Sequence, residues 1–119
     1  MVALAHAGSG AGFLAIGLGA VWVLNATNST VSRIEPTTNA TVAQIEVGEG
    51  PVDGGDIAIG GGYVWARVSD SLVAQMDPAT NRTIARFGPP SGSGSVGADN
   101  QALWISIENQ TLLWRVPLG

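Results

Sequence analysis

The sequence predicts an all-β fold made of repeated four-stranded units. Two observations support this prediction: a long internal repeat, and short apolar segments that alternate with turns rich in glycine, proline and asparagine. A helical repeat would hold an apolar period of 3.6 residues, and no such period persists through these glycines and prolines. A β-sandwich would leave the repeated spacing unexplained. Four strands in about 42 residues are typical of one blade of a β-propeller.

The first half of the repeat is an apolar hairpin around a glycine turn. Residues 12–24 (GFLAIGLGAVWVL) match residues 55–67 (GDIAIGGGYVWAR), with two glycines, a valine and a tryptophan 43 positions apart. Glycines between the two strands suit the positive φ angles of a tight hairpin turn. The strands predicted from this half are 14–16, 20–24, 57–59 and 63–67.

The second half of the repeat contains an acid-Pro-x-Thr-Asn turn. Residues 31–45 match residues 73–87 with six identities, all 42 positions apart. Proline presets φ at the start of such a turn, and asparagine tolerates the left-handed backbone conformation that ends it. The strands predicted from this half are 30–34, 41–47, 72–76 and 83–87.

The third copy of the repeat is weaker and stops after three strands. Leu103-Trp104 lies 39 positions after Val64-Trp65. The strands predicted in this copy are 96–98, 102–107 and 112–116.

The N-terminus has the spacing of a fourth strand without its blade. Val2 precedes Trp22 by 20 positions, just as Ile45 precedes Trp65 by 20. Because Ile45 lies in a predicted fourth strand, Met1–Ala5 is predicted to be one as well. The twelve strands therefore make about three blades, cut within a sheet.

The chain is predicted to be one partial propeller domain, residues 1–119. Its parts are the fourth strand of a split blade (1–7), two complete blades (12–47 and 55–88) and the other three strands of the split blade (94–118). Three blades are too few to close, since rings have about four to eight. Two completions stay open. A second copy gives six blades around a twofold axis with exchanged end strands, or a missing N-terminal half completes a longer propeller.

Two motifs of the repeat point to a family. They are the Gly-x-Val-Trp hairpin (19–22 and 62–65) and the Arg/Gln-Ile/Met-Asp/Glu-Pro-x-Thr-Asn turn with its following strand, and together they cover most of the chain. In these motifs the sequence resembles the YVTN-type repeat family, which includes the streptogramin (virginiamycin B) lyase-like propellers. The resemblance implies a propeller fold. It implies little about activity, because that family holds binding proteins, surface proteins, sensors and a few enzymes.

Composition excludes several classes of partner. Five arginines, no lysine and nine acidic residues give a net charge of −4 without a basic stripe, so neither nucleic acid nor an anionic membrane is expected. Without cysteine there are no disulfides or thiolate metal sites. The apolar stretch 12–24 is shorter than the roughly 20 residues that span a bilayer. A soluble protein is expected, from a GC-rich bacterial source and extracytoplasmic if it follows related propellers.

The candidate binding residues lie in loops predicted to share one face of the propeller. They are Asn25, Glu49, Asp53, Asp56, Arg67, Asp70 and Glu108. Asp53 and Asp56 sit in a glycine-rich loop and offer hard oxygen ligands for Ca²⁺ or Mg²⁺, although a solvated acidic loop explains them more simply. Arg67 replaces the Leu24 of the first copy, which suggests an anionic ligand or, more simply, an ion pair with Asp70.

No catalytic residue, metal site or cofactor is assigned. His6 is the single histidine, while the lyase-like relatives are understood to use a metal held by histidine and carboxylate groups. No serine has the setting of a nucleophile elbow. The tryptophans recur once per blade, at Trp22, Trp65 and Trp104, which favours packing between blades over stacking on a ligand.

The favoured hypothesis is a non-catalytic module that binds a small molecule or protein, or serves as a scaffold, and assembles as a homo-oligomer, a dimer first of all. A metal-assisted lyase or lactonase and a structural fragment without ligand are the alternatives.

Overall fold

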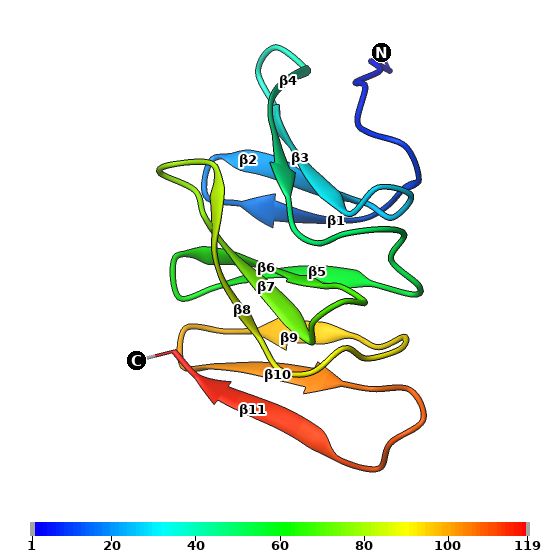
Figure 1. The fold of residues 1–119 in the computed structure, drawn as a ribbon. Coiled ribbons are helices and arrows are strands. Elements are labelled where there is room, and N and C mark those ends of the chain that lie inside the picture. The colour runs from blue at the N-terminus through cyan, green and yellow to red at the C-terminus, as the bar shows by residue number, and fades with distance from the viewer. Residues whose placement is uncertain (1, 119) are drawn as a thin grey trace.

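The computed structural model describes residues 2–118, which form three antiparallel sheets stacked side by side (Figure 1). We call the sheets blades 1, 2 and 3. Blade 1 contains β1 (Ala11–Gly17), β2 (Ala20–Asn25), β3 (Thr30–Glu35) and β4 (Ala40–Glu46). Blade 2 contains β5 (Asp56–Gly60), β6 (Tyr63–Arg67), β7 (Val73–Asp77) and β8 (Arg82–Phe87). Blade 3 contains β9 (Val96–Ala98), β10 (Ala102–Ser106) and β11 (Leu113–Pro117).

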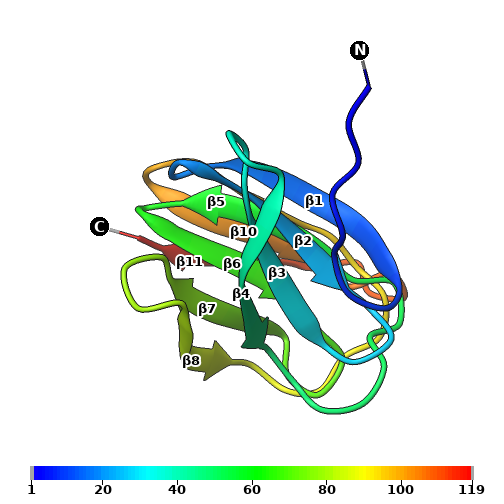
Figure 2. The ribbon, with the colours of Figure 1, turned by 90° about the horizontal axis from the view of Figure 1, so that it is seen from above.

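Within each blade the strands follow one another in sequence order, each paired with the next. Seen from above, they run from β1 and β5 on one side of the molecule to β4 and β8 on the other (Figure 2). Across the blades β1 contacts β5, and β5 contacts β9, so the first strands follow one another along one side of the stack, and we call them the inner strands. In the described part of the chain, no helix is long and apolar enough to cross a membrane.

Eleven strands form where the repeat predicts them, and most strand ends agree within one residue. The main difference is β1, which begins at Ala11, three residues before the predicted start. A register shift between Ala11 and Leu14 in its pairing with β2 accompanies this extension. The extra residues are held because Ala11 pairs with Asn25 at the end of β2.

The glycines and asparagines of the repeated turns adopt the conformations that these residues favour, whereas Leu18 of the β1–β2 turn has a φ of 53°, which leucine disfavours. Gly61 and Gly62 both have positive φ in the β5–β6 hairpin, as a two-residue turn between twisted strands requires. In the two acid-Pro turns, Asn39 and Asn81 have φ of 60° and 57°. The amide of Asn81 donates to the carbonyl of Asp77 at 2.9 Å. Asparagine is among the few residues that accept this left-handed conformation readily.

Packing between neighbouring blades forms two apolar cores. Trp22 and Trp65 are both fully buried, the first between blades 1 and 2 and the second between blades 2 and 3. Each indole Nε1 donates to the glycine carbonyl that ends its blade's first strand, Gly17 or Gly60, at 3.0 Å. Packing is therefore confirmed as the role of these two tryptophans. Trp104 differs, since 46% of it is exposed.

The β9–β10 turn contains the carboxylate of Asp99, whose pKa can be measured by NMR titration. Hydrogen bonds from the backbone amides of Ala102 and Gln101 lower the pKa of Asp99. A pKa lowered by folding means that Asp99 stabilises the fold above its unfolded-state pKa of about 3.9, and that this contribution is lost as the pH falls through the folded-state pKa. We expect an NMR titration to give Asp99 a midpoint below about 3.9. A midpoint at or above that value contradicts the two amide bonds.

The predicted strand Met1–Ala5 does not form within the single chain. Met1 lies outside the described residues, and residues 2–8 belong to no strand. The predicted partner of this strand is another copy, so its formation stays a prediction.

Candidate functional site

The loops that carry the candidate residues meet at one end of the blades, opposite the hairpin turns (Figure 1). Hydrogen bonds join loops of neighbouring blades there. The amide of Asp53 donates to Ser69 Oγ at 2.9 Å, and the amide of Glu108 donates to the carbonyl of Ser93 at 2.7 Å. We call this end the loop face.

A hollow of about 310 Å³ opens on the loop face beside the inner strands. It brings together two of the seven candidate residues, Asp56 and Glu108. The other residues that line it are Phe13, Gly54, Gly55, Gly94, Ser95 and Ser106. Two carboxylates and two hydroxyls next to an aromatic ring suit a cationic or hydroxyl-bearing ligand.

Both oxygens of the Asp56 carboxylate already accept hydrogen bonds from backbone amides. One oxygen accepts from the amide of Ile57 at 2.9 Å, and the other accepts from the amide of Val96 at 3.1 Å. The second bond ties blade 2 to blade 3. Glu108 is exposed, so it is the freer carboxylate of the hollow.

Asp53, the other candidate cation ligand, is exposed and does not line the hollow. In the described residues no three His, Asp or Glu side chains come together as a ligand set.

Arg67 does not pair with Asp70, so that interpretation of the sequence is wrong. Its side chain is buried, and its guanidinium donates to four backbone carbonyls. The acceptors are Val68 (2.9 Å), Leu72 (3.0 Å), Gly92 (2.5 Å) and Ser106 (3.4 Å). Burial lowers the pKa of Arg67, and the nearby charge of Asp56 partly offsets this effect. The guanidinium therefore holds the loops between blades 2 and 3.

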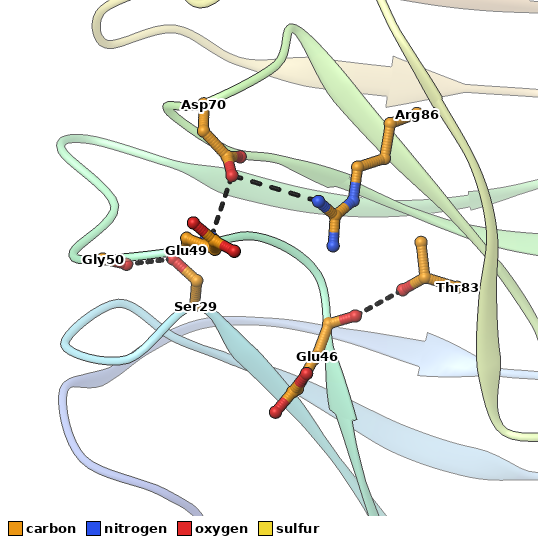
Figure 3. A network of polar contacts seen from close by, with 7 residues as sticks. All are labelled: Ser29, Glu46, Glu49, Gly50, Asp70, Thr83 and Arg86. Atoms are coloured by element: carbon orange, nitrogen blue, oxygen red, sulfur yellow. Dashed lines mark hydrogen bonds and ion pairs between the residues drawn. The ribbon is translucent and has the colours of Figure 1, made fainter.

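Asp70 takes part in a separate network between blades 1 and 2 (Figure 3). Its carboxylate accepts from the amide of Glu49 at 2.9 Å and lies 4.0 Å from the guanidinium of Arg86. In the same region Ser29 Oγ donates to the carbonyl of Gly50. Asp70 thus fixes the path of the loop that carries Glu49.

Asn25 is buried and anchors the segment before β1. Its amide nitrogen donates to Ser32 Oγ at 2.9 Å and to Thr30 Oγ1 at 3.1 Å, and its oxygen accepts from the amide of Gly8 at 2.9 Å. Both the nitrogen and the oxygen of this buried side chain are thus bonded to the protein itself.

Comparison with known proteins supports a fold and no activity. No protein-family model matches the chain, and no curated protein matches it. Among solved structures, Kuenenia stuttgartiensis hydrazine synthase matches 98% of this chain and 35% of its own, with a TM-score of 0.72 at 11% identity. The Myceliophteria thermophila Cps50 (Swd1) β-propeller domain matches 94% of this chain and 40% of its own, with a TM-score of 0.64 at 8% identity. The chain folds as part of a β-propeller.

A further similar structure is Myxococcus xanthus glutaminyl cyclase. It matches 92% of this chain and 55% of its own, with a TM-score of 0.60 at 16% identity. The chain thus spans between about a third and just over half of these structures. At such identities the likeness concerns the fold alone. The YVTN-type resemblance rests on the sequence motifs, since no family model supports it.

In the propeller, two residues of the hollow that sequence reasoning missed, Phe13 and Ser95, share one repeat position with the candidate Asp56. Phe13, Asp56 and Ser95 each lie two positions before the inner-strand residue that pairs with the blade's tryptophan. They therefore form a row along the inner strands. Aligning the third copy on this pairing would have revealed the row. Its weak sequence match concealed it.

The two end faces of the propeller expose residues that its interior blades bury. On blade 3, Trp104 occupies the repeat position of the buried Trp22 and Trp65. On blade 1, Ile16 is 76% exposed, whereas Ile59 at the same position of blade 2 packs against the first core. We call these surfaces the blade 3 face and the blade 1 face.

Proposed function

We propose that this chain is a non-catalytic propeller scaffold that closes into a ring of six blades with a second copy, and that its loop face binds a ligand. The proposal depends on the exposure of Trp104 at a position where Trp22 and Trp65 are fully buried. An indole left half in water loses roughly half of the stabilisation that burial of an aromatic side chain provides.

Because of the repeat, the two end faces correspond to the two surfaces that pack together inside the chain. The blade 1 face matches the side of blade 2 that packs on blade 1. The blade 3 face matches the side of blade 1 that packs on blade 2. Blade 3 of one copy can therefore meet blade 1 of another in the same manner as neighbours within the chain. Two such contacts, related by a twofold axis, close the ring.

Closure also removes exposed features that favour aggregation. Besides Trp104, Leu14 and Ile16 are exposed on the blade 1 face, and apolar surfaces of this kind mark interaction sites or aggregation hazards. A closed ring covers both end faces. It also places the two copies of the hollow around one central axis, where a ligand reaches residues of both chains.

Light scattering of the purified chain tests the assembly. We expect a mass twice the 12.1 kDa of the chain at micromolar concentration. Trp104→Arg is expected to leave a folded monomer, because a buried unpaired charge is not tolerated in such an interface and the exposed position tolerates it in the monomer. Circular dichroism checks the fold.

Ala79→Arg is the matched control for this variant. It adds the same charge to an exposed turn of blade 2 and is expected to remain a dimer. A monomeric wild type overturns the proposal and favours the reading in which further blades of a longer chain cover the faces. A dimer that survives Trp104→Arg equally contradicts it.

A further inference from the structure

The outer edge of blade 3 lacks the neighbour that the equivalent strands have. In blades 1 and 2 the third strand pairs with a fourth, β4 on β3 and β8 on β7. Within residues 2–118 no strand pairs with the outer edge of β11. A strand edge with free amides and carbonyls is a template for another strand.

The cross-strand pairs fix which residues of β11 are equivalent to those of β3. Trp104 pairs with Arg115 as Trp22 pairs with Arg33, so Leu113 takes the position of Val31. Val31 is fully buried, whereas Leu113 is 64% exposed. The edge is therefore apolar where a fourth strand belongs.

The N-terminal segment carries the side chains that this edge lacks. Ile45, which pairs with Val31, and Val47 beyond it are both buried. The residues 43 positions earlier are Val2 and Leu4, and they are 89% and 86% exposed.

We propose that residues 2–4 of one copy pair antiparallel with β11 of the second copy, with Val2 opposite Leu113. In this register Leu4 takes the place of Val47, which is buried. This inference rests on the proposed ring and adds the segment that joins its two chains.

A repeated hydrogen bond places His6 beside β4, as Glu46 on β4 lies beside β8. Between blades 2 and 1, Thr83 Oγ1 donates to the carbonyl of Glu46 on β4 at 2.6 Å. Thr41, at the repeat position of Thr83, donates to the carbonyl of His6. By the repeat, the residue equivalent to Glu46 is Ala3, whereas the observed acceptor is His6. The contact with β4 is therefore shifted by three residues along the segment from the position that the repeat predicts.

Residues 2–4 cannot reach the β11 edge of their own copy. β11 lies at the opposite end of the stack of blades from the N-terminal segment (Figure 1). The molecule is 44 Å long in its largest dimension, and the segment between residue 2 and β1 is tethered to blade 1 at Gly8 by Asn25. Only a second copy placed against blade 1 brings a β11 edge within reach of residues 2–4.

Disulfide trapping tests the register, because the chain contains no cysteine. The double variant Val2→Cys with Leu113→Cys is expected to give a covalent dimer on mild oxidation, since directly opposed residues meet the Cα separation of about 4.4–6.8 Å that a disulfide needs. The matched control, Ala3→Cys with Leu113→Cys, directs its first thiol to the other face of the strand. We expect it to cross-link several times less.

Light scattering of the same variants under reducing conditions separates this inference from the proposed function. A noncovalent dimer in which both cysteine pairs cross-link equally, or neither does, overturns the strand register and leaves the ring intact. A reduced monomer overturns both. Preferential cross-linking of the Val2 and Leu113 pair supports both.

Discussion

Trp22→Ala is expected to lower the free energy of unfolding by about 3–5 kcal/mol, the usual cost of removing a fully buried tryptophan. The side chain fills the core between blades 1 and 2, and its loss leaves a cavity that two stacked sheets close poorly. It also removes the Nε1 bond to Gly17. Urea unfolding followed by circular dichroism, at one fixed protein concentration, measures the change.

Loss of Trp22 is also expected to weaken the contacts of Arg33, because the Arg33 guanidinium lies over the Trp22 ring. The guanidinium lies 4.7 Å from the ring centroid and donates to Asn81 Oδ1 (2.7 Å) and to the carbonyl of Pro78 (2.6 Å) on blade 2. Trp22→Phe is the control, since it keeps an aromatic ring and loses only the indole bond and some volume. We expect it to cost clearly less than the alanine variant. A loss below about 1 kcal/mol for Trp22→Ala contradicts the assigned role.

Arg67→Met is expected to lower the free energy of unfolding by about 3 kcal/mol, because the change leaves buried carbonyls without donors. Methionine keeps much of the apolar stem and removes the guanidinium that serves Val68, Leu72 and Gly92. A Cβ at Gly94 would overlap the carbonyl of Ser106 and touch Arg67 Nη2, so the loop packs closely around the guanidinium. Denaturant unfolding reports the loss.

Two other arginine variants distinguish this bonding role from a general effect of charge. Arg67→Lys keeps the charge but lacks the planar fork of donors, so we expect it to recover only part of the stability. Arg82→Met removes an exposed arginine of β8 and is expected to change stability by about 0.5 kcal/mol or less. If Arg67→Met resembles Arg82→Met, the guanidinium does not hold the loops.

These contacts bear on function, because several polar residues that the sequence predicted to bind a ligand instead hold neighbouring blades together. Arg67 and Asp56 connect blade 2 to blade 3, and Asp70 connects the loops of blades 1 and 2. The hollow around Glu108, with its serine hydroxyls and Phe13, remains accessible to a ligand. A search for ligands should therefore begin with cationic and hydroxyl-bearing molecules at that hollow.

The repeat in the sequence determined the order and most of the ends of the eleven strands that the described residues form. Turn residues with fixed backbone preferences, such as Asn39 and Asn81, mark the strand ends locally. The strand ends can therefore be predicted without a structure. The recurrence of tryptophan likewise predicted packing between blades, and Trp22 and Trp65 are buried as expected.

Only the tertiary structure decided what the loop residues do. Arg67 and Asp70 are three positions apart, yet Arg67 is turned into the seam between blades 2 and 3 while Asp70 faces the loop of blade 1. Their partners are mostly backbone groups, and a backbone carbonyl has no signature in the sequence. The exposure of Trp104 was also hidden, because burial depends on whether a neighbouring blade is present and not on the residue itself.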